Sequence, residues 1–352
     1  MRYGIVVHGP EALDSGMARW FLDRLSQDHE VEATLGGAMG LAAVLDAGME
    51  ERIDASRREL VSEAVARLGR TSDIVLLLNW SKDRGSGEAF GRLVWEHVPP
   101  ALRCPMVQAD RDFFIVWEGK LNKELASLFR ERDLDRIRAP LSCEQREGVR
   151  AISGVRPGEN IWINGTVVGR ATSDDVTIRM CGGRLYFEGV DVKAHGLERV
   201  RVTDLGTAII RSGSVRRTSS PARAVGTAGG SRLILVDHKG EDSIFRARGS
   251  RAAVTVGDDT TRVCSALLAR LGVPVIGIVD GDEDGICTDS SFAPGTMIVK
   301  LRPGNDDQLG EKVRAEIFHG GDETEYDGDL SALAERIARM AGPSLLDVTR
   351  MI

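Results

Sequence analysis

The chain contains few aromatic residues and few cysteines. Only 5% of its 352 residues are aromatic, which predicts cores built mainly from aliphatic side chains. The five cysteines form no Cys-x-x-Cys pair, which argues against a zinc ribbon or a disulfide-bonded scaffold. No apolar run approaches the roughly 18 residues of a membrane-spanning helix, and the charged start is not typical of a signal peptide. We therefore expect a cytoplasmic protein with no membrane partner.

Glycine and acidic residues are abundant by contrast. The chain has 40 Gly, and its 53 Asp and Glu against 46 Lys and Arg give a net charge of −7. This acidic balance disfavours a general nucleic-acid coat, although it leaves a local basic groove open. At ~150 residues per domain, the length predicts two to three domains with sizeable cores.

Residues 1–120 alternate between apolar strands and helical stretches. Buried strands separated by helices indicate a parallel sheet that is covered on both faces. We expect a Rossmann-like or flavodoxin-like α/β domain here, followed by a helical connector over 121–150. The expected elements are strands at 3–7, 31–35 and 74–78 and helices at 17–25 and 54–68.

From residue 161 the hydrophobic period changes to two, which indicates antiparallel strands. Asn164-Gly165 separates two such strands, and this dipeptide is the strongest short signal for a β-hairpin. A second hairpin is expected around Cys181-Gly182-Gly183. We predict a small antiparallel β module over 151–215 and a linker over 216–230.

Residues 231–352 return to the βα alternation and are predicted to form a second α/β domain. Three of its strands end in acidic turns. Because the carboxyl ends of parallel strands share one edge of a sheet, these acids are expected to converge. The acids are Asp237, Asp258, Asp280, Asp282 and Asp284.

Clustered carboxylates repel one another, and a hard divalent cation relieves that repulsion. Ligands that are all oxygen select Mg²⁺ or Mn²⁺ over zinc. The sequence therefore predicts a metal site made by Asp280, Asp282, Asp284 and Asp258. Solvated turn residues are the alternative interpretation, since Asp and Gly are common in turns.

The order of these turns resembles that of a Toprim domain, the metal-binding module of primases and topoisomerases. Val236-Asp237-His238 stands where the bacterial primases have Val-Glu-Gly. Gly257-Asp258-Asp259-Thr260-Thr261 is similar to the second turn of that domain, and Asp280-Gly281-Asp282-Glu283-Asp284-Gly285 is similar to the third. The resemblance covers under a fifth of the chain.

This resemblance implies a Toprim-like fold in which Asp280 and Asp282 hold Mg²⁺, with Asp284 or Asp258 assisting. It also implies that Asp237 or His238 acts as the general acid or base. The chain departs from the pattern there, because Asp237 replaces a Glu and His238 replaces a Gly. The departure puts nucleotidyl transfer in question and leaves metal binding in place.

The whole chain also resembles an uncharacterised archaeal family, found chiefly in methanogens and known as domain of unknown function 2117. The resemblance rests on 7–11, 14–16, 35–40, 46–48 and the turn at Asp280. The family has no established activity. The resemblance implies an archaeal, cytoplasmic protein.

The first domain has a candidate ligand site of its own. Its strands are followed by loops that contain glycine, and such loops can present backbone N–H groups to a phosphate. We expect them to meet at one sheet edge and to bind a nucleotide or another phosphate-bearing ligand, with a lysine as the anion partner; tight structural turns are the alternative. The residues of this predicted site are His8, Gly9, Ser15, Gly36, Gly37, Asn79 and Lys82.

Arg211, Arg216 and Arg217 lie in a stretch without acids, which could hold a phosphate backbone or be a solvated loop. The leading hypothesis is Mg²⁺-dependent phosphoryl or nucleotidyl chemistry on a nucleotide or nucleic acid. The competing hypotheses are a non-catalytic, regulatory protein that binds a nucleotide or phosphate ligand, and a nucleic-acid processing factor. The sequence leaves a homo-oligomer open.

Overall fold

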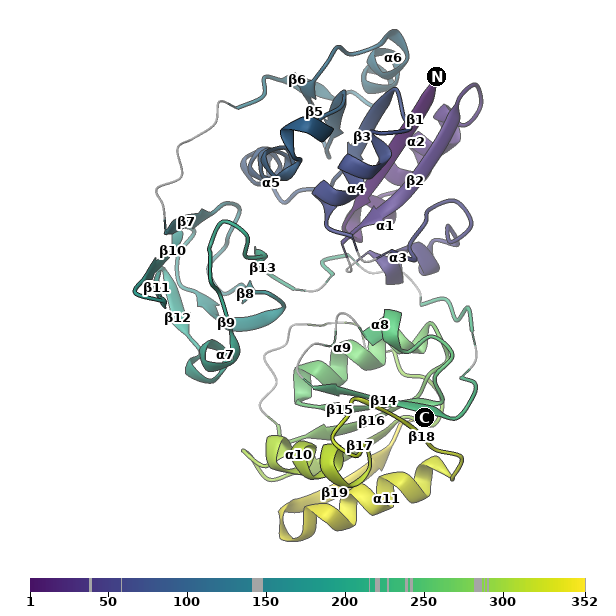
Figure 1. The fold of residues 1–352 in the computed structure, drawn as a ribbon, viewed down its shortest axis with the longest axis vertical. Helices are drawn as coiled ribbons and strands as arrows, with labels where there is room; N and C mark the ends of the chain where they lie inside the picture. The colour runs from purple at the N-terminus through teal and green to yellow at the C-terminus, as the bar shows by residue number, and fades with distance from the viewer. Residues whose placement is uncertain are drawn as a thin grey trace. The chain divides into compact units, whose positions relative to one another are not determined.

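The computed structural model divides the chain into two compact units, Met1–Gly213 and Ser214–Ile352 (Figure 1). The residues that it describes are 1–37, 40–57, 59–140, 148–214, 216–218, 222–226, 228–237, 240, 243–281, 287, 289 and 291–351. Among these residues, no helix is both long enough and apolar enough to cross a membrane. The predicted α/β class is confirmed, with parallel strands at the centre of a sheet in each unit.

The first unit contains a six-stranded sheet with the strand order β2-β1-β3-β4-β5-β6. The first four strands in that order are parallel, β5 is antiparallel to β4, and β6 is parallel to β5. Because β2 and β3 flank β1 on opposite sides, the strand order reverses between β1 and β3. Ligands in such sheets bind outside the carboxyl ends of the strands at this reversal. The strands are β1 (Arg2–His8), β2 (Glu30–Gly36), β3 (Ile74–Leu78), β4 (Met106–Ala109), β5 (Phe113–Glu118) and β6 (Asp135–Ile137).

Helices cover both faces of this sheet. Val65 of α4 and Val94 of α5 join Leu77 of β3 in one buried cluster. On α2 and α6, Phe21 and Phe129 pack edge to face, and Phe129 stacks on Phe114 of β5. The helices of this sheet are α1 (Glu11–Asp14), α2 (Met17–Leu25), α3 (Leu41–Asp46), α4 (Val61–Leu68), α5 (Arg84–His97) and α6 (Lys123–Glu131).

Two sequence-based expectations differ from this structure. The helix expected over 54–68 begins only at Val61. Asp54 instead accepts hydrogen bonds from the backbone N–H and hydroxyl of Ser56, which fixes a turn rather than a helix start. In the predicted connector 121–150, α6 is helical as expected, but β6 extends the sheet by one strand; residues 141–147 lie outside the described residues.

The β module of the first unit is built from a three-stranded sheet and a four-stranded sheet. Both predicted hairpins are present, and the first turns through Asn164 and Gly165 with φ of 50° and 82°. Ile161, Val168 and Ile178 belong to one buried cluster shared by the two sheets. Its elements are β7 (Val149–Ile152), β8 (Asn160–Ile163), β9 (Thr166–Ala171), β10 (Val176–Cys181), β11 (Arg184–Glu188), β12 (Val190–Val192), α7 (Ala194–Arg199) and β13 (Ile210–Ser212).

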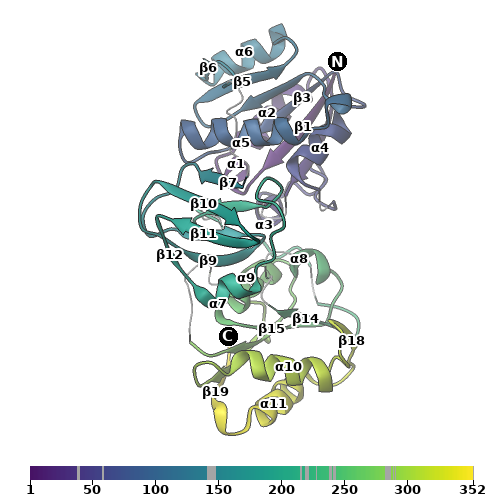
Figure 2. The same ribbon diagram turned by 60° about the vertical axis from the view of Figure 1, so that its left-hand side comes forward.

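The second unit contains a six-stranded sheet with the order β18-β14-β15-β16-β17-β19. Its four central strands are parallel, and both edge strands are antiparallel to their neighbours. In both ribbon views α8 and α9 lie on one side of this sheet and α10 and α11 on the other (Figures 1 and 2). The elements are β14 (Arg232–Asp237), α8 (Ser243–Arg246), β15 (Ala252–Val256), α9 (Asp258–Ala269), β16 (Val275–Val279), β17 (Met297–Leu301), α10 (Asp306–Glu316), β18 (Glu323–Glu325), α11 (Leu330–Ala341) and β19 (Leu345–Arg350).

The core of the second unit is aliphatic, as the low aromatic content predicts. Leu235, Val254 and Ile278 lie on three adjacent strands and belong to one buried cluster. Val313 of α10 and Ile337 of α11 pack into the same cluster from the helix side. This packing holds β14, β15 and β16 in register, so their carboxyl ends lie next to one another at one edge of the sheet.

Candidate functional site

Three predicted acids lie at the carboxyl ends of adjacent strands in the second unit. Asp237 is the last residue of β14 and pairs with Val256 of β15. Asp258 follows β15 after one glycine and begins α9, and Asp280 directly follows β16. We call Asp237, Asp258 and Asp280 the acidic edge. The strand ends that carry these three acids therefore lie next to one another at one edge of the sheet.

Asp258 shapes the turn that carries Asp280. One carboxylate oxygen of Asp258, Oδ2, accepts hydrogen bonds from the backbone N–H groups of Asp280 and Gly281 at 2.9 and 3.0 Å. Gly281 has a φ of 92°, a conformation that favours glycine over residues with a Cβ atom. The Asp258 carboxylate thus fixes the backbone at Asp280 and Gly281.

Asp280 is a buried acid with one oxygen that lacks a protein partner. The residue is 5% exposed. Oδ2 accepts a hydrogen bond from the backbone N–H of Gly304. Oδ1 is buried and has no hydrogen-bond partner among the residues that the structure describes. A buried carboxylate oxygen without a partner carries a desolvation cost, which a cation or a donor on a ligand can offset.

Asp237 differs from Asp280 because its charge is already paired. Its Oδ2 atom lies 3.2 Å from Nη2 of Arg314 on α10. Arg314 also forms an ion pair with Asp322, so one guanidinium bridges two carboxylates. This pairing fixes the position of the Asp237 carboxylate at the acidic edge and balances part of its charge.

The remaining predicted residues of this site are His238, Asp282 and Asp284, and they lie outside the described residues. Over the described part of the chain, no three His, Cys, Asp or Glu side chains form a group that could hold a metal ion. Among the described residues of this edge, hydrogen bonds join the Asp258 carboxylate to the backbone of Asp280 and Gly281. This geometry does not test the Toprim resemblance.

The first unit also places polar groups at the carboxyl ends of its central strands. His8 ends β1 and Asn79 follows β3, so both lie at the strand reversal. Their side chains are joined by a hydrogen bond of 2.8 Å between Nδ1 of His8 and Oδ1 of Asn79. The His8 ring stacks on Phe90 of α5, with ring centres 4.0 Å apart. The structure therefore brings these two predicted residues together.

The sequence-based prediction of this site did not include Asp110, which follows β4. Its carboxylate is fully buried and accepts five hydrogen bonds. One comes from Nδ2 of Asn79 at 2.7 Å, and another comes from Nε2 of Gln108 at 3.1 Å. Gln108 is itself a buried polar residue in β4. The polar pair Gln108 and Asp110 at the end of an otherwise apolar strand is the sequence signal that could have identified it.

Burial lowers the pKa of His8, whereas its hydrogen bond to Asn79 and the charges of Glu11 and Asp110 raise it by a smaller amount. The net shift is downward. His8 is therefore neutral at neutral pH, and the imidazole carries a single N–H.

The predicted glycines and Ser15 have backbone roles. Gly9 and Gly37 have φ of 78° and 84°, which favour glycine. A Cβ on Gly36 would lie 2.9 Å from both Val6 and Val61, so close packing of α4 against β1 needs glycine there. The Ser15 hydroxyl, between α1 and α2, donates a hydrogen bond to the carbonyl oxygen of Ala12 and accepts one from the backbone N–H of Met17.

Lys82, the expected anion partner, contacts the β module. Its Nζ atom lies 2.6 Å from Oε2 of Glu159 and 2.8 Å from the hydroxyl of Ser212. Its charge is thus balanced by a carboxylate of the protein. The contact ties the loop after β3 to β8 and β13.

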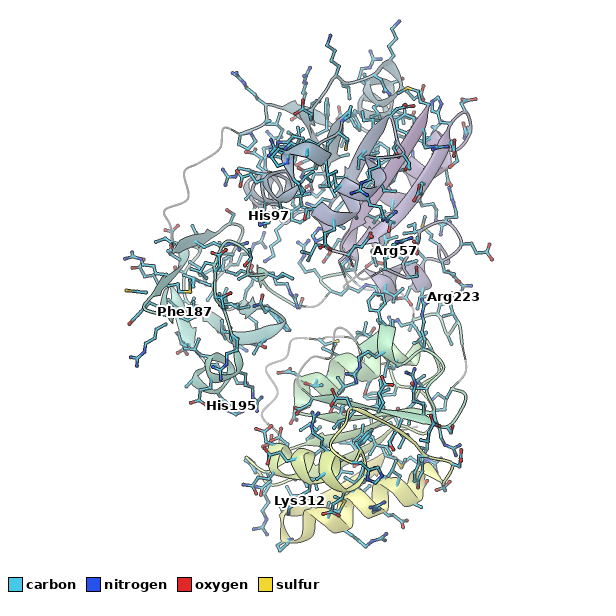
Figure 3. All side chains as sticks on the ribbon, in the orientation of Figure 1. Arg57, His97, Phe187, His195, Arg223 and Lys312 are labelled. Carbon is cyan, nitrogen blue, oxygen red and sulfur yellow. The ribbon has the colours of Figure 1, made fainter. Side chains whose placement is uncertain are left out.

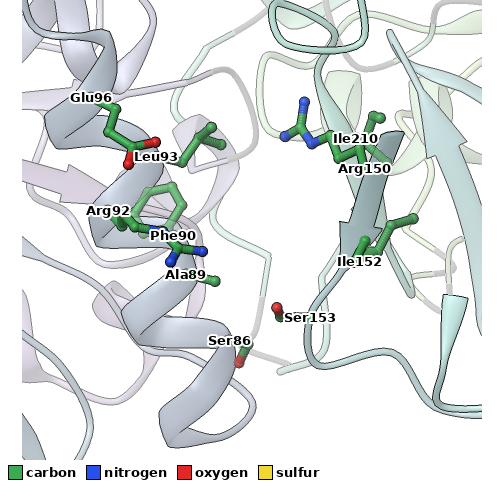
Figure 4. A pocket seen from close by; sticks show the side chains of 11 residues that line it. Ser86, Ala89, Phe90, Arg92, Leu93, Glu96, Arg150, Ile152, Ser153 and Ile210 are labelled. Carbon is green, nitrogen blue, oxygen red and sulfur yellow. The ribbon is translucent and has the colours of Figure 1, made fainter. Parts of the chain in front are cut away.

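The predicted arginines divide between the two units. The Arg211 guanidinium lies over the Trp162 ring, 4.0 Å from its centre, which is the geometry of a cation–π contact. Arg216 and Arg217 belong to the second unit, and each takes part in an interaction. A separate feature of the first unit is a pocket between α5 and the β module (Figure 4). It is lined by Phe90, Arg92, Glu96, Arg150 and Ile210, among others, and Arg150 is held by the carbonyl groups of Leu205 and Ala208.

These features define the class of protein as a two-unit α/β protein with polar groups at the carboxyl edge of each parallel sheet. The chain belongs to an archaeal family described as uncharacterised proteins conserved in archaea, domain of unknown function 2117, whose model matches residues 5–321. It is 35% identical over 328 residues to an uncharacterised protein of Methanocaldococcus jannaschii, which covers 88% of this chain and 90% of the relative. The resemblance to this family is confirmed.

Proposed function

We propose that the acidic edge binds a divalent cation, Mg²⁺ or Mn²⁺, and that the protein uses it in phosphoryl or nucleotidyl chemistry on a phosphate-bearing ligand. The observation that carries this proposal is the buried Oδ1 atom of Asp280, which has no hydrogen-bond partner among the described residues. Oxygen ligands at this position favour a hard cation.

Each described acid has a distinct part in this proposal. Asp280 and Asp258 hold the cation, and Asp258 also keeps the turn of Asp280 in place through its two backbone hydrogen bonds. A bound cation of this kind polarises a phosphate oxygen and orients the attacking group. Asp237, held by Arg314, accepts or returns a proton at its carboxylate.

A nucleotide is a better candidate substrate than a nucleic acid. Arg211, one of the three arginines expected to hold a phosphate backbone, stacks on Trp162. A nucleic acid would add contacts to several phosphates and hence a steep salt dependence. Binding that weakens steeply with salt and that is lost in Arg216→Ala/Arg217→Ala would instead favour the nucleic acid.

Isothermal titration of the full chain with Mg²⁺ and Mn²⁺ tests the metal site. The key variant is Asp280→Asn, which keeps an acceptor for Gly304 but removes the charge. The matched control is Asp347→Asn, which makes the same change on exposed residue 347 of β19. We expect binding heat in the wild type and in the control, and at least about tenfold weaker binding in Asp280→Asn. Equal titrations in all three proteins would remove the cation site.

The chemistry needs a separate measurement. Phosphate or pyrophosphate release from nucleoside triphosphates is expected to require Mg²⁺ or Mn²⁺ and to be lost in Asp280→Asn. Asp237→Asn is expected to retain cation binding and to lose turnover. If the cation binds but no phosphate compound is turned over, the acidic edge is a binding site and the catalytic part of the proposal fails.

A further inference from the structure

The connected side chains His8, Asn79 and Asp110 form a polar chain in the first unit that the proposed function does not use. We infer that His8 is an acid–base group whose Nε2 atom accepts a hydrogen bond, and then a proton, from an uncharged or positively charged O–H or N–H group of a small-molecule ligand. The ligand would sit at the reversal between β1 and β3, where His8 ends its strand.

The chain starts at Asp110, whose carboxylate is surrounded by hydrogen-bond donors. Oδ1 accepts from the backbone N–H and the hydroxyl of Ser81 and from the N–H of Arg111, at 2.7 to 2.8 Å. Oδ2 accepts from Asn79 and Gln108. Four of these five contacts come from N–H groups, which can only donate. Hydrogen bonds to a charged acceptor of this kind are short and strong.

The Asp110 carboxylate fixes the orientation of the Asn79 amide. A carboxylate only accepts hydrogen bonds, so the amide must turn its NH₂ group toward Asp110. The Asn79 carbonyl oxygen then faces Nδ1 of His8 at 2.8 Å, and an oxygen at that position requires a proton on Nδ1. The neutral imidazole carries one proton, which leaves Nε2 with a free lone pair.

The described residues offer no hydrogen-bond partner to that Nε2 atom, and His8 is only partly buried. Its ring plane is fixed from one side by the stacked ring of Phe90. The hydrogen bond at Nδ1 and the stacked Phe90 ring together fix the orientation of the imidazole. Nε2 is therefore an acceptor that is already positioned for a hydrogen-bond donor on a ligand.

The charges that face His8 select the class of ligand. Glu11 of α1 and Asp110 after β4 are the charged groups that act on its imidazole, and both are acids. The nearby cation expected from the sequence, Lys82, is paired with Glu159. A neutral hydroxyl or an ammonium group is therefore favoured here over a phosphate.

Burial keeps His8 neutral, and the interposed amide adds no full charge that would oppose this effect. A carboxylate in direct contact would stabilise the imidazolium, but Asn79 passes on orientation without a full negative charge. When the ligand proton moves to Nε2, the O–H or N–H bond of the ligand breaks and its electron pair stays on the ligand atom. The imidazolium keeps its Nδ1–H bond to Asn79, so no group in the protein has to rearrange.

Imidazole ¹⁵N spectra of the full-length protein test the tautomer directly. His8→Gln identifies the His8 signals by their loss. We expect a neutral His8 at pH 7 with Nδ1 protonated and Nε2 unprotonated. A neutral His8 with the proton on Nε2, or an imidazolium at pH 7, would overturn the inference.

Acylation by diethyl pyrocarbonate tests access to Nε2, because the reagent reacts with an unprotonated imidazole nitrogen. The exposed His195, labelled in Figure 3, and His319 serve as internal standards within the same protein. We expect His8 to be acylated in the wild type and an excess of inorganic phosphate to give no protection. An unreactive His8 beside reactive standards, or protection by phosphate, contradicts the inference.

The Asn79→Asp variant tests the role of the amide. A carboxylate beside Nδ1 is expected to raise the pKa of His8 by at least one unit. At a pH below the raised pKa, acylation of His8 should fall about tenfold relative to His195. Asn164→Asp makes the same change at a turn of the β module and should leave His8 unchanged. Equal His8 rates in Asn79→Asp and the wild type would contradict the positioning role of Asn79.

Discussion

Gly91 of α5 lies directly against Gln108 of β4. A Cβ atom on Gly91 would come within 1.7 Å of Oε1 of Gln108. The same Oε1 accepts a hydrogen bond from Nε1 of Trp117 at 3.0 Å, while Nε2 of Gln108 bonds Asp110. Glycine at this position therefore lets a helix approach the buried polar chain that ends at His8.

The first prediction follows from this close approach. Gly91→Ala should destabilise the protein by about 1–3 kcal/mol, because the added methyl group must displace Gln108 from its hydrogen bonds to Gly87, Asp110 and Trp117. Urea denaturation measures the loss. The displaced Gln108 should also shift the ¹⁵N signals of His8.

Gly85 provides the matched control on the same helix. A Cβ on Gly85 would meet only Oδ1 of Asp83, at an ordinary contact distance of 3.7 Å. Gly85→Ala should leave the stability unchanged or raise it by up to about 1 kcal/mol through helix propensity. If Gly91→Ala is as stable as Gly85→Ala, Gln108 can move without cost and the packing argument fails.

Local patterns predicted most of the fold. The helix expected over 17–25 is α2, and the turn at Asn164-Gly165 joins β8 and β9 as expected. These features depend on a hydrophobic period or on turn residues, which are properties of neighbouring residues. The predicted start of α4 was wrong. Asp54 can either cap a helix or close a turn, and here its hydrogen bonds to Ser56 close a turn.

The two sites were predictable to different degrees. The acidic edge could be expected because each of its acids follows an apolar strand and the strands are parallel. The pair Gln108 and Asp110 marks a polar strand end, but the sequence does not show that Asn79 and Ser81, far away in the chain, donate to the Asp110 carboxylate. The ion pair of Lys82 could not be predicted either, since its partner Glu159 lies in the β module.

The second prediction concerns the reactivity of cysteine. Burial raises the pKa of Cys264 in α9 to about 12, whereas Cys181 at the end of β10 is exposed. At pH 8 only roughly one in ten thousand Cys264 thiols would be ionised, and the thiolate is the reactive form. A short pulse of iodoacetamide should label Cys181 and spare Cys264. Peptide mass spectrometry measures both, and a pulse in urea should label them equally. Comparable labelling of the two in the native protein would contradict this burial.

The third prediction concerns the buried ion pair of the second unit. The Arg270 side chain is 1% exposed, and its Nη1 atom lies 2.8 Å from Oδ2 of Asp289. Burial alone raises the pKa of Asp289, but hydrogen bonds from Ser291 and the charge of Arg270 outweigh this effect and lower it. Asp289→Asn should therefore destabilise the protein by up to about 3 kcal/mol at pH 7, because it removes a carboxylate that faces a buried guanidinium.

The pH dependence of this destabilisation distinguishes the loss of the Asp289 charge from a poor fit of the asparagine side chain. An acid whose pKa is lowered by folding stabilises the folded state above its unfolded pKa, about 3.9, and the stabilisation disappears as the pH falls through the folded pKa. The difference in unfolding free energy between the wild type and Asp289→Asn should thus be constant from pH 7 to about 5 and shrink below pH 4. Asp327→Asn, on an exposed loop, should show neither effect. A difference that stays constant down to pH 3 would mean that the amide fails to fit and that the ion pair contributes little.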